Sequence, residues 1–485
     1  MKRKLLFISV GILMMTALCI RSFAVSSVPY HTYNYDYWKS VYYTPAAYVP
    51  TGTYSGEDLG TGLFSSPQDI FVADDGRIYV VDTGNNRIIV LDGDMRIERI
   101  VDGFLNNGAP DSFKSPSGVY VTENSELYIA DTDNLRIVAL DEGGSLLKII
   151  QDPKSEVLGD GFVFAPLKVV VDYAGRVYVV AKNMFQGIMA FDENANFTGF
   201  IGTIKVNISV TEKIWRVLST KVQRERQIQF IPTEFTNVDM APDGFVYATN
   251  YDPKGEQSVR RLNPKGQDVI QKKHEGSLSG DLYWRLGREY AGPSRIVDVA
   301  YRGNGIYTLL DTTRGRIFTY DHEGNLLYIF GGKGSQDGTF KNPTAIEVKD
   351  DKIMVLDASR GKIMVFSETQ YGSLINRATA LRYDGDEASA VALWQQVLKL
   401  DSNFELAYSG IGKSLLAAGE NKKAMEHFKL GMDREYYSIA YKRYRDDLLK
   451  ENLEYLLSLA MILFLAFWIG KASRKSKQKE ELYVE

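Results

Sequence analysis

The stretch "DTGNNRIIVLD" at residues 82–92 joins a polar turn to an apolar run, and it decides the fold of this chain. The same pattern returns as "DTDNLRIVALD" at residues 131–141. Looser copies follow as "DTTRGRIFTYD" at residues 311–321 and "DASRGKIMVFS" at residues 357–367. A catalytic motif normally occurs once, whereas a scaffold motif recurs, so the recurrence predicts a structural repeat.

Each copy of this motif ends a longer unit made of short apolar or alternating runs. Asp, Asn and Gly bound these runs, which is typical of short antiparallel strands rather than helices. We identify six such units, each with a proline at or near its start: Pro67, Pro116, Pro166, Pro232, Pro293 and Pro343. The third and fourth units keep the strands but lack the DTxNxR turn. Repeated sets of short strands predict an all-β propeller with six blades.

These units resemble the NHL repeat family, whose repeats fold as four-stranded blades around a central channel. Residues 55–370 are expected to form this propeller. In that family the Asp, Asn and Arg of the turn tie neighbouring strands and blades together. The resemblance therefore implies a structural role for the turn residues Asp82, Asn85, Arg87, Asp131, Asn134 and Arg136. A carboxylate beside a guanidinium makes charge-assisted hydrogen bonds, which suit such a role.

The residues just after the start of each inner strand are expected to face the channel of the propeller. Among them, five polar side chains form a candidate ligand-binding ring: Gln68, Asp69, Lys168, Asn237 and Arg295. Such a ring suits a polyol or an anion, held by hydrogen bonds and charge. A channel filled only with water is the alternative.

The resemblance also raises the question of catalysis, because NHL-type propellers include a zinc-dependent lyase and related six-bladed lactonases hold calcium. Zinc of that kind needs converging histidines, and none of the four histidines falls at the start of an inner strand. The candidate ring forms no evident calcium cage, and the sequence contains no GxSxG motif or phosphate-binding loop. We therefore expect no catalytic residues, no metal and no cofactor. A metal-dependent lactonase or hydrolase in the channel is the alternative function.

Both ends of the chain indicate export and membrane attachment. Residues 1–24 have a basic start, an apolar stretch and a final "SFA", as in a signal peptide, and they contain the only cysteine. Residues 451–470 are predicted to span the membrane, and the basic residues within 471–485 are predicted to lie in the cytoplasm. We therefore expect a single-pass type I protein of the cell membrane, with the bulk of the chain extracytoplasmic.

Two segments carry aromatic residues that suit either packing or recognition. The Tyr-rich segment 25–54 contains "AAYVPTGTY", which is expected to close the propeller ring, although tyrosines also stack on carbohydrate. The insert at residues 203–230 has helical spacing, and Trp215, Arg216 and Arg224 are candidate contacts with a protein partner or a membrane surface. An amphipathic cover packed on the propeller is the alternative for this insert.

After the blades, residues 371–450 change from strand to helical periodicity. The region aligns with itself so that Ala390 matches Ala424 and Trp394 matches Phe428, which resembles the tetratricopeptide repeat (TPR). Such repeats commonly bind peptides or proteins. Trp394 and Phe428 are therefore candidate partner contacts as well as fillers between helix pairs, and a spacer role is the alternative.

The whole layout resembles membrane-anchored NHL-repeat proteins of Gram-positive bacteria with TPR-like helices. It implies a non-enzymatic cell-surface protein that binds or scaffolds a protein partner, such as the subunits of a sugar ABC transporter. A carbohydrate-binding receptor is a further alternative. A net charge of -4 over 485 residues gives no general attraction to nucleic acid, so no nucleic-acid partner is expected.

Overall fold

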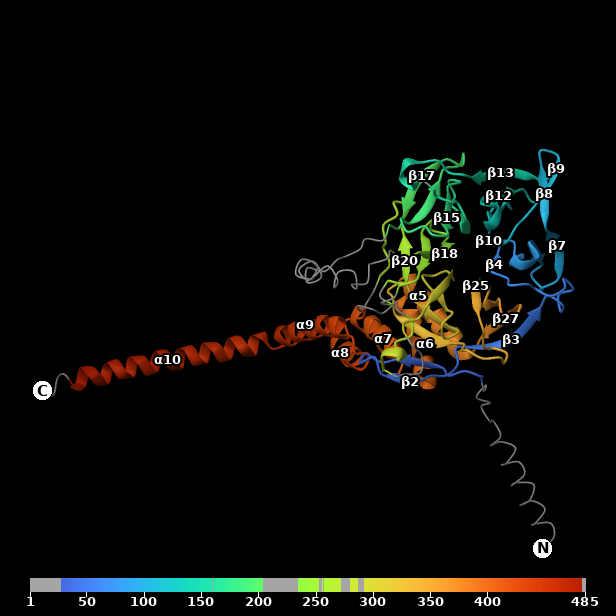
Figure 1. Cartoon of the computed structure of the whole chain (residues 1–485). Coiled ribbons are helices and arrows are strands. Elements are labelled where there is room, and N and C mark those ends of the chain that lie inside the picture. The colour runs from blue at the N-terminus through green and yellow to red at the C-terminus, as the bar shows by residue number, and fades with distance from the viewer. Residues whose placement is uncertain are drawn as a thin grey trace, which may run out of the picture. The chain divides into compact units, whose positions relative to one another are not determined.

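The computed structural model describes residues 28–159, 161–203, 234–252, 255, 257–271, 280–286 and 292–481. The predicted signal peptide and the insert residues Trp215, Arg216 and Arg224 lie outside these residues. The chain divides into two compact units, with the boundary after Tyr383. Within the described residues, the first unit is a six-bladed β-propeller and the second unit is helical (Figure 1). The predicted fold class is therefore confirmed.

Each of the first five blades is an antiparallel sheet whose strands follow one another in chain order. Blade one contains β4 (Asp69–Val72), β5 (Ile78–Asp82), β6 (Arg87–Leu91) and β7 (Ile97–Val101). Blade two contains β10 (Pro116–Val121), β11 (Leu127–Asp131), β12 (Arg136–Leu140) and β13 (Leu146–Gln151). Blade three contains β14 (Pro166–Val171), β15 (Val177–Ala181), β16 (Ile188–Phe191) and β17 (Phe197–Ile201).

The later blades follow the same order. Among the described residues, blade four contains β18 (Phe235–Met240), β19 (Val246–Asn250) and β20 (Val259–Leu262). Blade five contains β21 (Ile296–Tyr301), β22 (Tyr307–Asp311), β23 (Arg316–Tyr320) and β24 (Leu326–Phe330). Short elements lie outside the blades: β1 (Tyr33–Tyr35), β2 (Val41–Tyr43), β8 (Gly103–Asn106), β9 (Ala109–Ser112), η1 (Thr83–Asn85), η2 (Thr132–Asn134), η3 (Glu156–Leu158) and α4 (Tyr283–Leu286).

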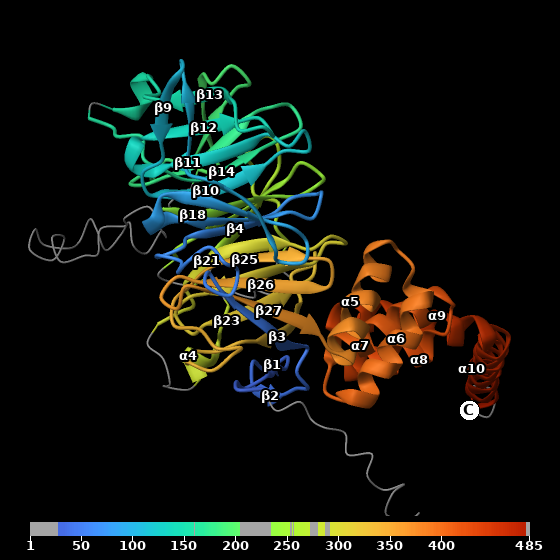
Figure 2. The same cartoon turned by 90° about the vertical axis from the view of Figure 1, so that its right-hand side faces the viewer.

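Blade six joins the two ends of the repeat region. It contains β25 (Pro343–Lys349), β26 (Lys352–Asp357), β27 (Lys362–Glu368) and, as its outer strand, β3 (Tyr48–Ser55). β3 pairs with β27 in antiparallel register along its length, and Figure 2 shows the two strands side by side. β3 thus closes the ring and covers an edge that β27 would otherwise expose.

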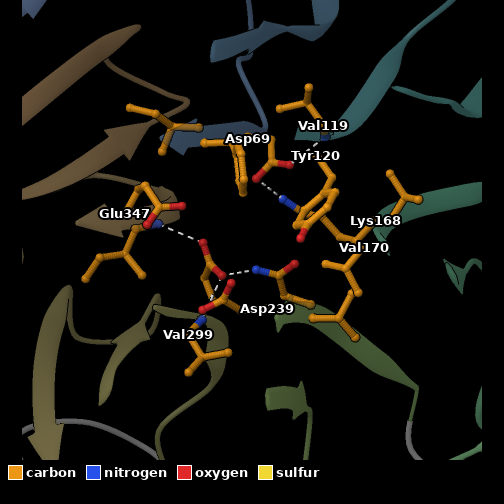
Figure 3. Close-up of a pocket in the computed structure, with 15 residues that line it drawn as sticks. Asp69, Val119, Tyr120, Lys168, Val170, Asp239, Val299 and Glu347 are labelled. Carbon is orange, nitrogen blue, oxygen red and sulfur yellow. Dashed lines mark hydrogen bonds and ion pairs between the residues drawn. The ribbon is translucent and has the colours of Figure 1, made fainter. Parts of the chain in front are cut away.

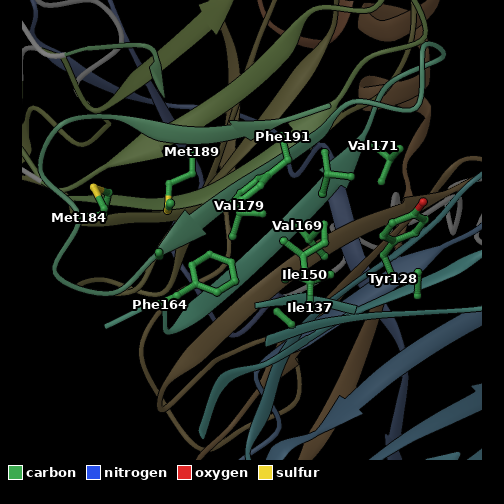
Figure 4. Packing of buried hydrophobic residues seen from close by; sticks show 14 of the residues in the cluster. Tyr128, Ile137, Ile150, Phe164, Val169, Val171, Val179, Met184, Met189 and Phe191 are labelled. Atoms are coloured by element: carbon green, nitrogen blue, oxygen red, sulfur yellow. The ribbon is translucent and has the colours of Figure 1, made fainter. Parts of the chain in front are cut away.

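The core of the propeller lies between neighbouring blades. Strands β11 and β15 are buried at every position, because each packs against other blades on both faces. Figure 4 shows one such interface, in which Tyr128, Ile137 and Ile150 belong to blade two while Val179 and Phe191 belong to blade three. Burial of a side chain of this size contributes about 1.5–3 kcal/mol. Burial on both faces explains why these strands are almost entirely apolar in the sequence, apart from the Asp131 that ends β11.

In blades one, two, five and six, the aspartate of the recurring turn fastens the blade to the segment that leads into it. In blade two, the buried Asp131 carboxylate accepts hydrogen bonds from the backbone N–H of Lys114 (2.7 Å), from Asn134 Nδ2 (2.9 Å) and from Arg136 Nε (2.8 Å). Asp82 of blade one accepts hydrogen bonds from the three equivalent groups, those of Ser65, Asn85 and Arg87. The polar atoms of the motif are thus used within the fold.

The Tyr-rich segment before β3 packs on blade five. Tyr33 is buried, and the guanidinium of Arg316 lies 4.6 Å from the centre of its ring. Tyr35 Oη donates a hydrogen bond of 2.5 Å to Asp281 Oδ1. These contacts anchor the strands that precede the ring closure.

Helix α5 (Gln370–Tyr383) belongs to the propeller unit. Its buried face includes Leu374, Ile375 and Ala378, at the spacing of one side of a helix. At its end, the largely buried Arg382 guanidinium donates a hydrogen bond of 2.8 Å to Glu323 of blade five. The helix is therefore fixed to the blade and continues the chain from a defined position.

The second unit is a succession of packed helices (Figure 1). They are α6 (Glu387–Leu400), α7 (Glu405–Ala417), α8 (Asn421–Leu430), α9 (Arg434–Glu451) and α10 (Leu453–Glu481). The Asp386 carboxylate caps α6 by accepting a hydrogen bond from Ser389 N (3.0 Å), and Asp433 caps α9 in the same way from Tyr436 N (3.2 Å). Glycines on α7 let the neighbouring helices approach closely: a Cβ on Gly412 would lie 2.7 Å from the ring of Phe428.

Trp394 and Phe428 hold these helices together instead of facing solvent. Both side chains are completely buried. Trp394 stacks on Phe404 at 6.1 Å between ring centres and lies against Gly410 of α7. The two aromatic residues therefore fill the spaces between helices as expected, but their burial corrects the suggestion that they contact a partner.

Helix α10 contains a segment that is long and apolar enough to cross a membrane. This segment, Leu453–Lys475, has a mean hydropathy of 2.0 and is entirely exposed in the isolated chain. It is the one such helix in the described part of the chain, and it is consistent with a single-pass membrane anchor.

Replacement of Asp131 with alanine is predicted to destabilise the propeller by about 2–3 kcal/mol. The change leaves the Lys114 backbone N–H without its acceptor and removes one of the acceptors of Asn134 and Arg136. Arg136 keeps its ion pair with Asp111. Denaturant unfolding of the purified full-length protein measures this loss. Asp94→Ala is the matched control, since the Asp94 carboxylate is exposed and pairs only with the exposed Arg96. Equal unfolding curves for the two variants would contradict a structural role for the turn.

Candidate functional site

The inner strands of the six blades surround the channel and place side chains at two levels. Pairing with the second strands defines equivalent positions in every blade. The upper level consists of Asp69, Gly118, Lys168, Asn237, Asp298 and Ala345. The lower level, two residues further along each strand, consists of Phe71, Tyr120, Val170, Asp239, Ala300 and Glu347.

The structure brings three of the five predicted ring residues into one pocket. Asp69, Lys168 and Asn237 line it together (Figure 3). Gln68 lies outside the lining and turns its amide to the carbonyl of Ser66 (3.2 Å). Arg295 also lies outside the lining, with its guanidinium 5.5 Å from the ring centre of Tyr251.

The misplacement of Arg295 has a simple cause in the register of blade five. In blades two and three, the leading proline pairs with the last residue of the second strand. In blade five, Ile296 holds that position opposite Asp311, and Pro293 precedes it by three residues. The proline is therefore a poor marker of the inner strand in this blade, and the channel residue is Asp298.

Three functional residues were missed by the sequence reasoning: Asp239, Asp298 and Glu347. A signal for Asp298 was available, because its separation from the turn residue Asp311 equals that between Asp69 and Asp82. Counting back from the turn would thus have placed it. Asp239 and Glu347 lie at the lower level, which the prediction did not consider.

The carboxylates of the channel connect neighbouring blades. Asp69 Oδ2 accepts a hydrogen bond from the backbone N–H of Val119 in blade two (2.9 Å). Asp298 Oδ2 accepts one from Ile346 N in blade six (2.7 Å). Asp239 Oδ2 accepts one from Tyr301 N in blade five (2.8 Å). These bonds satisfy inner-strand donors that the blade itself leaves unpaired.

The charges at the two levels do not balance. The Lys168 ammonium bonds to Asp69, and the amide of Asn237 bonds to Asp298. Among the residues that line the pocket, four are carboxylic acids and one is a lysine. A buried carboxylate without a counter-charge tends to take up a proton instead of remaining ionised.

The pKa values of these carboxyl groups reflect this imbalance. Burial raises the pKa of Asp298 to about 8 against the opposing charge of Lys168. Burial raises the pKa of Asp239 to about 7, and the nearby Asp69 adds to the rise. Burial also raises the pKa of Glu347 well above its usual value, with Asp239 as the next cause. Some of these groups therefore carry a proton at neutral pH.

The residues of the channel do not fit the metal ions of related propellers. Within the described residues, no three carboxylate, histidine or cysteine side chains converge on a common point as ligands would. Asp69 is already bound to the ammonium of Lys168. The donor set offers neither the histidines that zinc prefers nor a free cage of oxygens for calcium.

The free space in the pocket is small. It amounts to about 20 Å³, which is room for about one water-sized group. A sugar or lactone ring does not fit in this space as the side chains now lie.

Comparison with known proteins identifies the repeat. Residues 64–91 match the model of the NHL repeat. A search of the curated proteins gives no match. Among solved structures, the chain is similar to a virginiamycin B lyase from Staphylococcus aureus at 10% identity, over 64% of this chain and 97% of that chain, with a TM-score of 0.40.

Two further solved structures have comparable similarity. A streptogramin B lyase is 12% identical over 63% of this chain and 94% of its own, with a TM-score of 0.38. A protein of unknown function from Bacteroides thetaiotaomicron is 14% identical over 63% of this chain and 70% of its own, with a TM-score of 0.39.

The propeller is predicted to lose stability as pH rises from about 6 to 9. A carboxyl group whose pKa is raised by folding binds its proton more tightly in the folded chain. The stability that this group adds to the folded protein is complete below its pKa in the unfolded chain. It is lost as pH rises through its pKa in the folded chain. The unfolding temperature of the full-length protein should fall by at least about 2 °C over this interval.

The Asp298→Asn variant tests the source of this pH dependence. It removes one titrating group, so its unfolding temperature should vary less with pH than that of the wild-type protein. Asp94→Asn changes an exposed carboxylate and should keep the wild-type slope. A stability that rises from pH 6 to 9 would refute the assignment of protonated carboxyl groups in the channel.

Proposed function

We propose that this NHL-repeat propeller is a membrane-anchored, non-enzymatic binding protein that holds a protein partner at the cell surface. The partner suggested by the layout is a membrane complex such as the subunits of a sugar ABC transporter. The predicted signal peptide and the basic residues after the apolar helix support an extracytoplasmic propeller with a cytoplasmic tail.

The observation that carries this proposal is a set of exposed apolar side chains on one face of the propeller. Leu63, Leu105, Val157 and Val163 are each at least 57% exposed. All four lie in segments that lead into the inner strands of blades one, two and three. In a propeller these connections share one end of the blades, so the four side chains belong to segments at the same end, here called the connection face. Exposed apolar groups gathered on one face mark protein contacts.

The channel supports the non-enzymatic part of the proposal. Asp69, Asp298 and Asp239 are engaged by backbone donors of neighbouring blades. The remaining space of about 20 Å³ leaves no room for a sugar ring beside them. These three carboxylates also hold the ring together, so the main contact area for a macromolecular partner is assigned to the outer surfaces.

The helical unit offers a second surface for a partner. Its TPR-like character rests on the sequence alignment of α6 with α8. Because Trp394 and Phe428 are buried, contact would use exposed side chains such as Ile439 and Tyr441 of α9. Trp215, Arg216 and Arg224 of the insert stay candidate contacts from the sequence.

Substitution on the connection face is predicted to release the partner. Leu105→Asp combined with Val163→Asp places charges where apolar contact is expected, and recovery of the partner should fall at least about tenfold. The measurement is mild crosslinking in native membranes, purification of the full-length protein and quantitative mass spectrometry, followed by reconstitution with the purified partner. Ile97→Asp is the control, because Ile97 is exposed on the outer strand of blade one.

Two results would contradict the proposal. One is recovery of the wild-type protein without a stoichiometric partner. The other is equal retention of the partner by the double variant and the Ile97→Asp control. Either result would remove the connection face as the binding surface.

A further inference from the structure

The lower level of the channel combines acids with aromatic rings. Asp239 and Glu347 project from blades four and six, while Phe71 and Tyr120 project from blades one and two. All four line the same pocket, and the two aromatic rings contact each other with their centres 5.1 Å apart. Figure 3 shows the carboxylates of Asp239 and Glu347 and the ring of Tyr120 around one central space. These four residues are here called the acid-aromatic pocket.

The fold does not require an acid at the position of Glu347. The equivalent residues of blades three and five are Val170 and Ala300, which are apolar. Glu347 Oε1 accepts a hydrogen bond from Val348 N (2.8 Å), its own neighbour in the strand, so this bond joins no second blade. A buried acid in this position costs stability through desolvation. Its presence therefore points to something that binds it.

The channel already contains one ammonium group. Lys168 Nζ lies against Asp69 at the upper level, where a carboxylate from another blade accepts it. Asp239, Asp298 and Glu347 have no such cation among the residues that line the pocket. Lys168 thus shows that the channel carboxylates can hold an ammonium group. The acids of the lower level could hold a second one.

The acid-aromatic pocket is open to a small cation. Asp239 and Glu347 face the channel and keep some contact with solvent, although the surrounding protein desolvates both carboxyl groups enough to raise their pKa values. The free space of about 20 Å³ admits a water-sized group such as an ammonium head. The alkyl part of an amine would extend from it past the half-buried Phe71 and Tyr120 toward the mouth of the channel. At the same end of the channel, the turns between first and second strands carry the exposed acids Asp74, Glu123 and Asp243. Such a mouth attracts cations from solution.

We propose that the acid-aromatic pocket binds a protonated organic amine, with its ammonium group between Glu347 and Asp239 and its alkyl part against Phe71 and Tyr120. Carboxylates supply the counter-charge, and aromatic faces attract an organic cation within about 6 Å. The amine comes from a free diamine or polyamine, or from a lysine side chain of another protein. This site is separate from the connection face and does not depend on the function proposed above.

The titrating groups around the pocket give its binding a defined pH dependence. Asp69, Asp239, Asp298 and Glu347 are the acids that face it, with Lys168 and Tyr120 as the other ionisable neighbours. Burial raises the pKa of Asp239 to about 7 and that of Glu347 well above its usual value. An aliphatic amine stays protonated at pH 8. Binding should therefore strengthen from pH 6 to 8 and release protons.

The test is calorimetric titration of the purified full-length protein in detergent with 1,4-diaminobutane at pH 8. Saturable binding to the wild-type protein is expected, together with proton release seen as a dependence of the heat on the buffer. Glu347→Gln should weaken binding at least about tenfold while the variant still folds, because an amide removes a buried charge. Glu156→Gln is the matched control, since Glu156 is exposed on η3, in the connection between blades two and three, and should bind as the wild type does.

The outcomes separate the sources of the amine and the competing ions. Binding of diaminobutane supports a free amine, whereas binding of a lysine-rich peptide alone supports a lysine of another protein. Equal heats from uncharged 1,4-butanediol, binding of calcium in place of either amine, or no effect of Glu347→Gln would overturn the proposal. Failure of amine binding leaves the partner-release experiment on the connection face unaffected.

Discussion

The propeller depends on the buried carboxylate of the recurring turn. Asp131 holds a backbone N–H of the incoming segment with one oxygen, and side chains of its own turn with the other. One residue thus fixes where a blade begins and how its second and third strands turn. A charged group in this position is stable because both oxygens have donors, two of them from side chains of the same turn, and the loss of a donor would weaken that compensation. That requirement explains why the aspartate is kept in four of the six units while the residues after it vary.

The fold could be predicted from the sequence because this requirement repeats and is local. The same logic located Asp69, Lys168 and Asn237 in the channel. It failed at Arg295, since the position of the inner strand in blade five is set by pairing of Ile296 with Asp311 and not by the proline before it. The side chains of Trp394 and Phe428 were placed correctly between helices, but only three-dimensional packing reveals that no part of them is exposed. A pocket formed by residues from separate blades leaves no motif in the sequence of any single blade. Nothing in the sequence therefore indicated that Glu347 belongs to the pocket.

The acids of the channel fall into two classes once their partners are known. Asp69, Asp298 and Asp239 each reach a backbone donor of another blade, so their desolvation is offset by bonds that stabilise the ring. Glu347 bonds to its own strand and adds negative charge to a ring that Lys168 only partly neutralises. The first class is explained by architecture. Glu347, the second class, is an acid whose desolvation costs stability and is not offset by a bond to another blade. Residues that cost stability in this way concentrate at functional sites.

Blade topology also determines the chemistry of the two faces. Tight turns between antiparallel strands need residues that accept a left-handed backbone, so Gly76, Gly175 and Gly244 occupy such positions there, with φ between 72° and 84°. Acids favour such turns, and the mouth at this end becomes acidic partly as a by-product. The longer connections at the other end also contain left-handed residues such as Asn107, Gly108 and Gly159, and they carry the exposed apolar groups of the connection face. Turn chemistry does not extend to Glu347, which lies beyond the register shift between Pro343 and Ala345 and pairs regularly with Met354. An acid mouth alone would thus be unremarkable in this fold, whereas the carboxylate of Glu347 within the strand is a feature that the turns cannot explain.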